Sequence, residues 1–316
     1  MNSALLQFFY TVKPLIPRSL QILLRRKLIR QIRAASSTVW PIFPGSGDPS
    51  EGWTGWPDGA RFAIVLTHDI ETAVGVDRVC EVMRREKELG FCSSFNFVPE
   101  RYDVRESIRR EIVGNGFEVG VHGLKHDGKL FFSRRVFRKR GAAINRYLAE
   151  WGAVGFGAPA MHHNFDWIPD LNIEYDSSTC DTDPFEPQPD GAGTIFPYVM
   201  PESLVADGEG IVELPYTLPQ DFTLFVLMQE EDTSIWEKKL CWLAETGGMV
   251  LMKTHPDYMN LYNSKLRIDE YPGELYFRFL EYIKSTYHGQ YWHVLPRDMA
   301  RFWISHHSGA TFHRSR

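Results

Sequence analysis

Residues 61–71 read Arg61-Phe62-Ala63-Ile64-Val65-Leu66-Thr67-His68-Asp69-Ile70-Glu71, an apolar run that stops abruptly at acidic residues. A run of this kind is typical of a strand buried on both faces, as in a parallel sheet. Because successive side chains of an extended chain alternate, we expect Asp69 and Glu71 to point to the same side. The stretch therefore predicts a buried strand that presents two carboxylates at its carboxyl end.

Two later apolar runs repeat this pattern and end in histidines. Residues 118–121 lead into His122 and His126, and residues 248–252 lead to His255. On a helical turn, positions i and i+4 share a face, so His122 and His126 could bind one divalent ion such as zinc. Alone, such a pair is more often two surface or packing histidines. Since α/β folds gather active sites at the carboxyl ends of their strands, the three runs together favour one metal site.

Short apolar strands alternate with helical patterns from residue 61 onward. This alternation predicts an α/β fold with a mainly parallel sheet, and seven or eight such units favour a distorted (β/α) barrel over an open sheet. The predicted strands are 62–66, 94–98, 117–121, 153–157, 211–214, 249–252 and 291–295, with a weaker one at 173–175. The predicted helices are 77–89, 134–151 between Ser133 and Gly152, 234–245 with a capping box of Ser234 and Glu237, and one from Gly273 through Tyr287.

Residues 181–210 break this rhythm, because they are rich in proline, glycine and acidic residues. Loops of this length are uncommon in compact domains and are often lids or binding loops. The aromatic residues Phe185, Phe196 and Tyr198 predict that this loop is ordered and packs against the domain.

The first 47 residues form a basic, amphipathic arm with seven lysines and arginines and no acidic residue. No run in the arm is long enough to cross a bilayer, but such a segment can lie in an anionic membrane interface. Packing of the arm on its own domain or on a partner is an equal alternative. We expect residues 48–60 to be a linker and residues 61–316 to form the barrel domain.

Composition limits the class of protein. The chain has 316 residues, 43% of them hydrophobic, and a formal net charge of −5, which gives no case for nucleic-acid binding. Its four cysteines are scattered singly. Buried free thiols and the lack of a recognisable signal peptide predict a cytoplasmic protein, peripheral on the inner face of the membrane if the arm binds lipid.

Taken in chain order, five short motifs resemble those of the polysaccharide deacetylases, which are carbohydrate esterase family 4 or NodB-homology proteins. The motifs are Asp69-Ile70-Glu71, His122-x3-His126, Gly157-Ala158-Pro159, Tyr175-Asp176-Ser177-Ser178 and His255-Pro256, and the resemblance spans about residues 61–303. It implies a distorted (β/α) barrel that holds a divalent metal, usually zinc, with one carboxylate and two imidazoles.

The resemblance also implies roles for individual residues. Asp69 corresponds to the catalytic base and His255 to the general acid, while Glu71, His122 and His126 correspond to the metal ligands. Asp69 could instead cap the following helix or be a second carboxylate ligand. We expect substrate contacts from residues near the third and fourth motifs, namely Pro159, His162 and Asp181.

Two departures from the family pattern stand out. Ile70 takes the place of the second of two adjacent aspartates, which moves the metal carboxylate to Glu71. The arginine of the Arg-x-Pro motif, which orients the base, is replaced by Gly157. His162, His163 or an arginine from elsewhere could substitute for it.

The sequence favours a metal-dependent hydrolase that removes an N- or O-acyl group, acetyl or formyl, from a sugar in surface-polysaccharide biosynthesis. An H-E-x-x-H protease is excluded because Gly123 stands where its glutamate would be, and no G-x-S-x-G elbow occurs. Two alternatives stay open. One is hydrolysis of a small non-sugar amide, and the other is a glycan-binding or scaffolding pseudoenzyme, which the lost arginine suggests.

Overall fold

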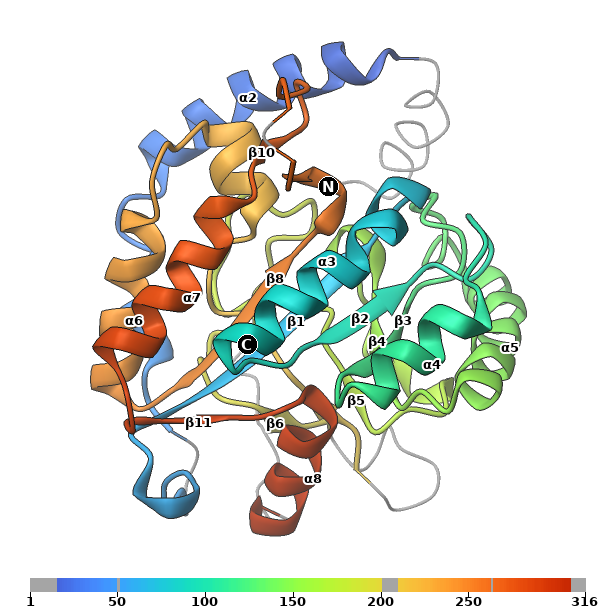
Figure 1. Ribbon diagram of the computed structural model, residues 1–316. Coiled ribbons are helices and arrows are strands. Elements are labelled where there is room, and N and C mark those ends of the chain that lie inside the picture. The colour runs from blue at the N-terminus through green and yellow to red at the C-terminus, as the bar shows by residue number, and fades with distance from the viewer. Residues whose placement is uncertain (1–15, 50–51, 201–209, 263, 308–316) are drawn as a thin grey trace.

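A curled, mostly parallel sheet forms the centre of the structure (Figure 1), a computed structural model that describes residues 16–49, 52–200, 210–262 and 264–307. Its strands follow the order β11-β1-β2-β3-β4-β5-β7-β6, and β8 also pairs with β1. Every pairing is parallel except that of β6 with β7. The strands are β1 (Phe62–Ile70), β2 (Ser94–Phe97), β3 (Glu118–His122), β4 (Gly155–Gly157), β5 (Tyr175–Asp176), β6 (Tyr198–Val199), β7 (Val212–Glu213), β8 (Met249–Thr254) and β11 (Tyr291–His293).

The segment after β7 brings the sheet round to β8. Leu218 forms a parallel bridge with Met252, and the Thr217 amide donates to Leu251 O at 3.0 Å. Because β8 pairs in turn with β1, the sheet curls into a distorted (β/α) barrel. The predicted fold class is therefore confirmed, and each of the eight predicted strands is present. The antiparallel β6 was not predicted.

Strand β1 explains why residues 61–71 are so apolar, since every residue of β1 is buried. Its side chains alternate as expected. His68 points to one side, where its imidazole contacts Glu86 at 2.8 Å and Thr254 at 2.7 Å. Asp69 points to the other side, toward Asn96. The strand thus separates a buried polar cluster under helix α3 (Ala73–Leu89) from the carboxylate that faces the site.

Helices surround the sheet (Figure 1): α4 (Glu106–Gly114), α5 (Arg134–Trp151), α6 (Ser234–Thr246), α7 (Glu274–Thr286) and α8 (Pro296–His307). Helix α5 has the predicted bounds, because Ser133 Oγ accepts from the Val136 amide and Gly152 closes the helix with a φ of 62°. The capping box at Ser234 is wrong by one residue. Thr233 is the N-cap of α6 and its hydroxyl bonds Glu237 instead. A π-helix at Phe222–Met228 was not predicted.

The part of the N-terminal arm that the structure describes forms helix α2 (Arg18–Ala35), which lies across one end of the barrel (Figure 1). Ile22 and Ile29 of α2 belong to the main hydrophobic core. The segment expected to be a linker also packs there, since Trp56 is buried and its Nε1 donates to Gly247 O at 2.8 Å. Residues 1–15 of the predicted arm lie outside the described residues. No described helix combines the length and apolarity that a membrane span requires.

Two smaller expectations can also be compared with the structure. Phe185 and Phe196 of the long loop are buried, as predicted for an ordered loop, while residues 201–209 lie outside the described part of the chain. All four cysteines are free thiols, but only Cys180 is buried, and Cys80 and Cys241 are exposed on their helices.

Candidate active site

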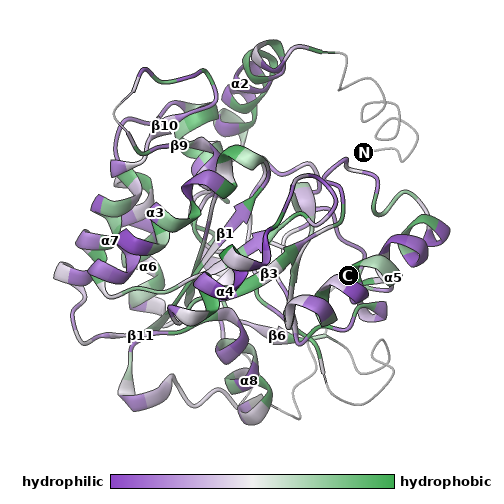
Figure 2. Ribbon diagram, turned by 45° about the vertical axis from the view of Figure 1, so that its right-hand side comes forward, coloured by the Kyte–Doolittle hydropathy of each residue, from purple (hydrophilic) through white to green (hydrophobic). Residues whose placement is uncertain are grey.

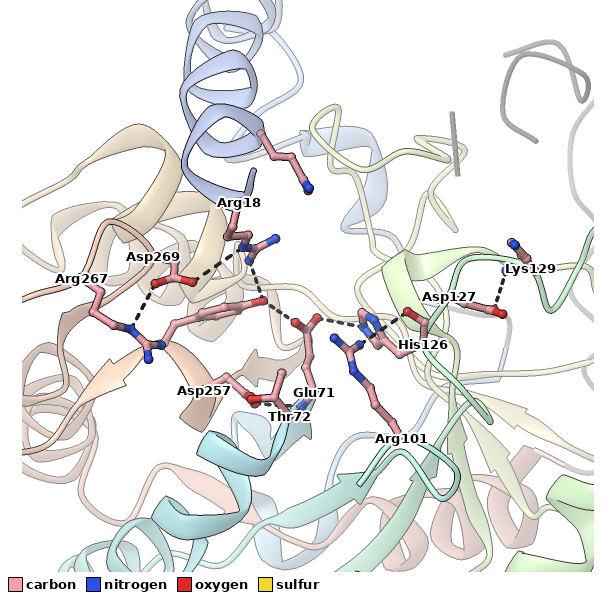
Figure 3. A pocket seen from close by; sticks show the side chains of 12 residues that line it. Arg18, Glu71, Thr72, Arg101, His126, Asp127, Lys129, Asp257, Arg267 and Asp269 are labelled. Atoms are coloured by element: carbon pink, nitrogen blue, oxygen red, sulfur yellow. Dashed lines mark hydrogen bonds and ion pairs between the residues drawn. The ribbon is translucent and has the colours of Figure 1, made fainter. Parts of the chain in front are cut away.

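Two strand ends meet beside one pocket, which has a volume of about 460 Å3 (Figure 3). Glu71 follows β1, His122 ends β3, and His126 lies in the loop after β3. One ligand atom from each of these residues lies within 4.8 Å of the other two. The Glu71 carboxylate contacts His126 Nε2 at 2.9 Å. The residues expected to bind metal are therefore brought together, and this group does not include Asp69.

His122 is positioned by its backbone neighbours. Its Nδ1 donates to Gly157 O at 3.0 Å, which leaves the Nε2 lone pair free to bind a metal. Burial lowers the pKa of His122 to about 4, so the ring is neutral at pH 7, as a ligand must be. The helical turn expected for the H-x3-H pair is absent. The loop bends at Gly123 and His126, with φ values of 62° and 51°, and this left-handed backbone brings the two rings together.

Glu71 is held from two directions. Its amide donates to Asp257 Oδ2 at 2.8 Å, and the Tyr258 hydroxyl donates to Glu71 Oε2. Tyr258 in turn accepts from Arg18 of α2 at 3.3 Å, so a chain of contacts links the N-terminal helix to the carboxylate (Figure 3). Although burial acts to raise the pKa of Glu71, His126 lowers it well below its ordinary value. Glu71 is therefore ionised at neutral pH.

Asp69 is buried beside this group. Its Oδ1 accepts from Asn96 Nδ2 at 2.9 Å, and its Oδ2 lies 3.3 Å from Lys253 Nζ and 3.6 Å from His122 Nδ1. Burial acts to raise the pKa of Asp69, but His122, Lys253 and His255 lower it below the ordinary value. The carboxylate is therefore ionised and faces the site.

His255 follows β8 and is oriented by Asp221, at the start of the π-helix. His255 Nδ1 lies 2.7 Å from Asp221 Oδ1, and the His255 amide donates to Asp221 Oδ2 at 2.9 Å. Burial acts to lower the pKa of His255, but Asp221, Glu71 and Asp69 raise it to about 9. The imidazole is therefore protonated at neutral pH. Asp221 was not predicted, because no motif connects it with a histidine 34 positions later.

Comparison with known proteins bears on the fold. No family model matches the sequence, and a comparison with curated proteins also finds no match.

Solved structures do match. A polysaccharide deacetylase structure from Mycobacterium smegmatis aligns with a TM-score of 0.58 and 18% identity, over 85% of this chain and 99% of that chain. One from Pseudomonas aeruginosa PAO1 aligns with a TM-score of 0.59 and 17% identity, over 82% and 95% of the two chains. The chain has the polysaccharide deacetylase fold. An allantoinase, PuuE, aligns equally well, with a TM-score of 0.59 and 18% identity over 83% and 96% of the two chains.

Lys253 of β8 lies beside Asp69, the carboxylate that the family arginine was expected to orient. Its ammonium donates to Ser177 O at 2.9 Å, contacts Asp69, and is fully buried. A Cβ atom at position 157 would lie 3.5 Å from Lys253 Nζ, which is an ordinary van der Waals distance, so Gly157 and the lysine ammonium are direct neighbours. The cationic side chain beside Asp69 is therefore a lysine from β8, whereas the sequence led us to expect His162, His163 or an arginine.

The three residues expected to contact substrate have different environments. Pro159 and His162 line a small cavity of about 10 Å3 that borders the main pocket at His126. Asp181 lines neither cavity and is fully buried, with its carboxylate 2.7 Å from Lys239 Nζ. Burial raises the pKa of Asp181 to about 6. Because it is buried in this ion pair, Asp181 cannot reach a substrate in the pocket.

Basic side chains around the main pocket were not predicted. They come from four separate segments and are Arg18, Arg101, Lys129 and Arg267. Arg18 comes from the N-terminal helix (Figure 3), so the pocket is not complete within residues 61–316.

Proposed function

We propose that this protein is a metal-dependent hydrolase that removes an N- or O-acyl group, acetyl or formyl, from a saccharide or sugar conjugate. One observation carries the proposal: an ionised carboxylate, Asp69, and a protonated imidazole, His255, adjoin a carboxylate and two imidazoles that can hold a metal. The reaction belongs, in this proposal, to surface-polysaccharide biosynthesis. The four free cysteines support a reducing, cytoplasmic location.

The residues present fit a divalent ion. Glu71, His122 and His126 form the mixed carboxylate and imidazole set that zinc prefers, and three protein ligands leave a position open for chemistry. His126 Nε2 is buried and has no hydrogen-bond donor directed at it, as expected for a ligand atom. When bound, the metal supplies Lewis acidity that activates water and polarises an acyl carbonyl.

The side chains supply the proton transfers. Asp69 is ionised and accepts a proton from the attacking water, while His255 is protonated and gives one to the departing amine or alcohol. Their environments shift the two pKa values in opposite directions, which is how neighbouring groups divide acid and base roles. Lys253 holds the Asp69 carboxylate in place, and Asp221 holds His255.

Two other functions remain as alternatives. One of the similar structures is an allantoinase, and this likeness supports hydrolysis of a small non-sugar amide. A pseudoenzyme that binds glycan is the other, because the family arginine is absent at Gly157. The ammonium of Lys253 beside Asp69 favours an active enzyme.

The deciding experiment combines metal analysis with an assay of acid release. Wild-type protein should contain one divalent ion, and His126→Ala should lose it. Metal-loaded wild type should release acetate or formate from a panel of N-acylated sugars and sugar nucleotides, and Asp69→Asn should reduce turnover by about 10²–10⁴-fold. His255→Ala should slow the same step, with losses that are less than additive in the double variant. Glycan binding without acid release from any substrate would establish the pseudoenzyme instead, and release only from small non-sugar amides would establish the other alternative.

A further inference from the structure

Helix α2 has two chemically different faces. The face toward the barrel carries Ile22 and Ile29, which are buried, together with arginines that contact the barrel. Arg26 Nε donates to Val226 O at 2.9 Å, Arg33 pairs with Glu230, and the Arg25 guanidinium lies 5.0 Å from the Phe222 ring centre. The opposite face carries leucines that are exposed: Leu20, Leu23, Leu24 and Leu28. Several arginines of α2 therefore contact the barrel, whereas its leucines are exposed to solvent.

The segment between β9 (Met259–Asn260) and β10 (Tyr271–Pro272) lies beside α2 (Figure 1). It carries a second group of exposed apolar side chains. Arg26 Nη2 donates to Ile268 O at 3.0 Å, and Arg18 Nε lies 3.7 Å from Asp269, so α2 and this segment are joined. The exposed side chains of this segment are Tyr262, Leu266 and Ile268. With the four leucines they form what we call the leucine face. Apart from these seven, Val113 is the single exposed large hydrophobic residue among those described.

The fully exposed charges within the leucine face are basic. Helix α2 contains no acidic residue, and Lys27 and Arg30 are exposed among its leucines. Lys265 is exposed beside Leu266. Figure 2 shows the resulting mixture of hydrophilic and hydrophobic residues along α2, at the outside of the molecule. Apolar side chains interleaved with exposed cations match a surface of acyl chains and anionic headgroups.

We propose that the leucine face docks on an anionic lipid bilayer. The leucines enter the boundary between headgroups and acyl chains, and Lys27, Arg30 and Lys265 lie at the level of the lipid phosphates. Large exposed apolar patches on soluble proteins are interaction sites. The exposed cations favour an anionic lipid surface over a second copy of this chain as the binding partner. In a dimer formed through this face, the cations of the two copies would repel each other.

Docking in this way would also place a helix that lines the pocket at the membrane surface. Arg18 is part of α2 and lines the same pocket as Glu71 and His126 (Figure 3). If the proposed function holds, the saccharide is therefore best supplied as an anionic, lipid-anchored sugar whose headgroup enters the pocket from the membrane plane. The basic side chains Arg101 and Lys129 line that pocket and suit a phosphate on such a headgroup.

Sedimentation of the full-length protein with vesicles tests docking separately from catalysis. Wild type should sediment with phosphatidylcholine vesicles that contain phosphatidylglycerol, and less so as salt is raised. It should bind pure phosphatidylcholine weakly. Leu23→Glu/Leu24→Glu, which changes side chains that are 53% and 55% exposed, should reduce the partition coefficient by about tenfold or more.

Val113→Glu is the matched control, because Val113 is also 53% exposed but lies on α4. It should bind anionic vesicles like wild type. Circular dichroism should show both variants folded. The proposal is overturned if wild type fails to bind anionic vesicles, if the double leucine variant binds as wild type does, or if that variant instead dissociates a wild-type dimer seen by light scattering.

Discussion

Lys253 and Gly157 share one small space next to Asp69, although they come from different strands. The lysine extends from β8 and the glycine ends β4. A buried ammonium 3.3 Å from a buried carboxylate interacts strongly with it, because the surroundings are poor in water. The interaction with Asp69 depends on where the positive charge lies and does not depend on which strand supplies it.

We expect Lys253→Ala to reduce kcat by about 10²-fold, because Asp69 would lose the contact that fixes its carboxylate. The loss should fall on kcat more than on KM, since Lys253 does not line the pocket. The double variant Lys253→Ala/Gly157→Arg should recover much of the activity, as the arginine would then have room to reach Asp69. Steady-state kinetics with a substrate identified in the assay of acid release measures both effects.

Gly157→Arg with Lys253 retained is the control for this exchange. This variant should be less active than wild type, because the arginine and the lysine would compete for one space. A purely structural lysine would show a different pattern, in which the double variant is no more active than Lys253→Ala.

Asp221 sets the pH range of the proposed acid. His255 must be protonated to act, and Asp221 keeps it so by raising its pKa to about 9. Removing the negative charge with Asp221→Asn lowers that pKa, so the alkaline limb of the profile of kcat/KM against pH should move to lower pH. The Tyr271 hydroxyl donates to the same carboxylate at 3.0 Å. Tyr271→Phe leaves the charge in place and should leave the limb close to its wild-type position, whereas equal limbs for wild type and Asp221→Asn would contradict the assignment of the acid.

Among the elements, helix α2 differs most from its sequence-based prediction, which was an arm attached to the barrel by a linker. Ile22 is fully buried in the barrel core, and Trp40 and Trp56 are buried in the segment that follows. The helix also closes one side of the pocket through Arg18. We infer that α2 and the barrel unfold together.

Ile22→Ala should therefore destabilise the whole protein by about 2–5 kcal/mol, as expected for emptying a buried site. Chemical denaturation followed by tryptophan fluorescence measures this change. Leu23→Ala, on the exposed face, should change the free energy of unfolding by less than about 0.5 kcal/mol. An independent arm would instead leave the barrel transition of Ile22→Ala where it is in wild type.

At the scale of the molecule, local patterns predicted the elements better than the contacts between them. Apolar runs located the strands because both faces of the parallel sheet are buried, and Ser133 and Gly152 fixed the ends of α5 through short-range caps. The motif residues Glu71, His122 and His126 converge as their order implied.

Features that depend on packing of distant segments could not be predicted in this way. Asp221, the arginines of α2 and the lysine beside Asp69 have partners that are distant in the sequence. The ion pair of Asp181 with Lys239 is another such case, since a polar, proline-rich sequence gave no sign that this carboxylate would be buried. The left-handed backbone at His126 is likewise set by the loop as a whole.

The shared space of Gly157 and Lys253 has a consequence for descent. If the ammonium replaces the guanidinium, the two positions should change together during divergence, with a small residue at 157 accompanying lysine at 253, and arginine at 157 accompanying a residue without charge at 253. An alignment of homologues would show this as paired substitution between β4 and β8. Selection would then retain a positive charge at one location in the barrel, whichever strand supplies it. A motif search that requires the arginine would miss every homologue in which a lysine from β8 supplies this charge.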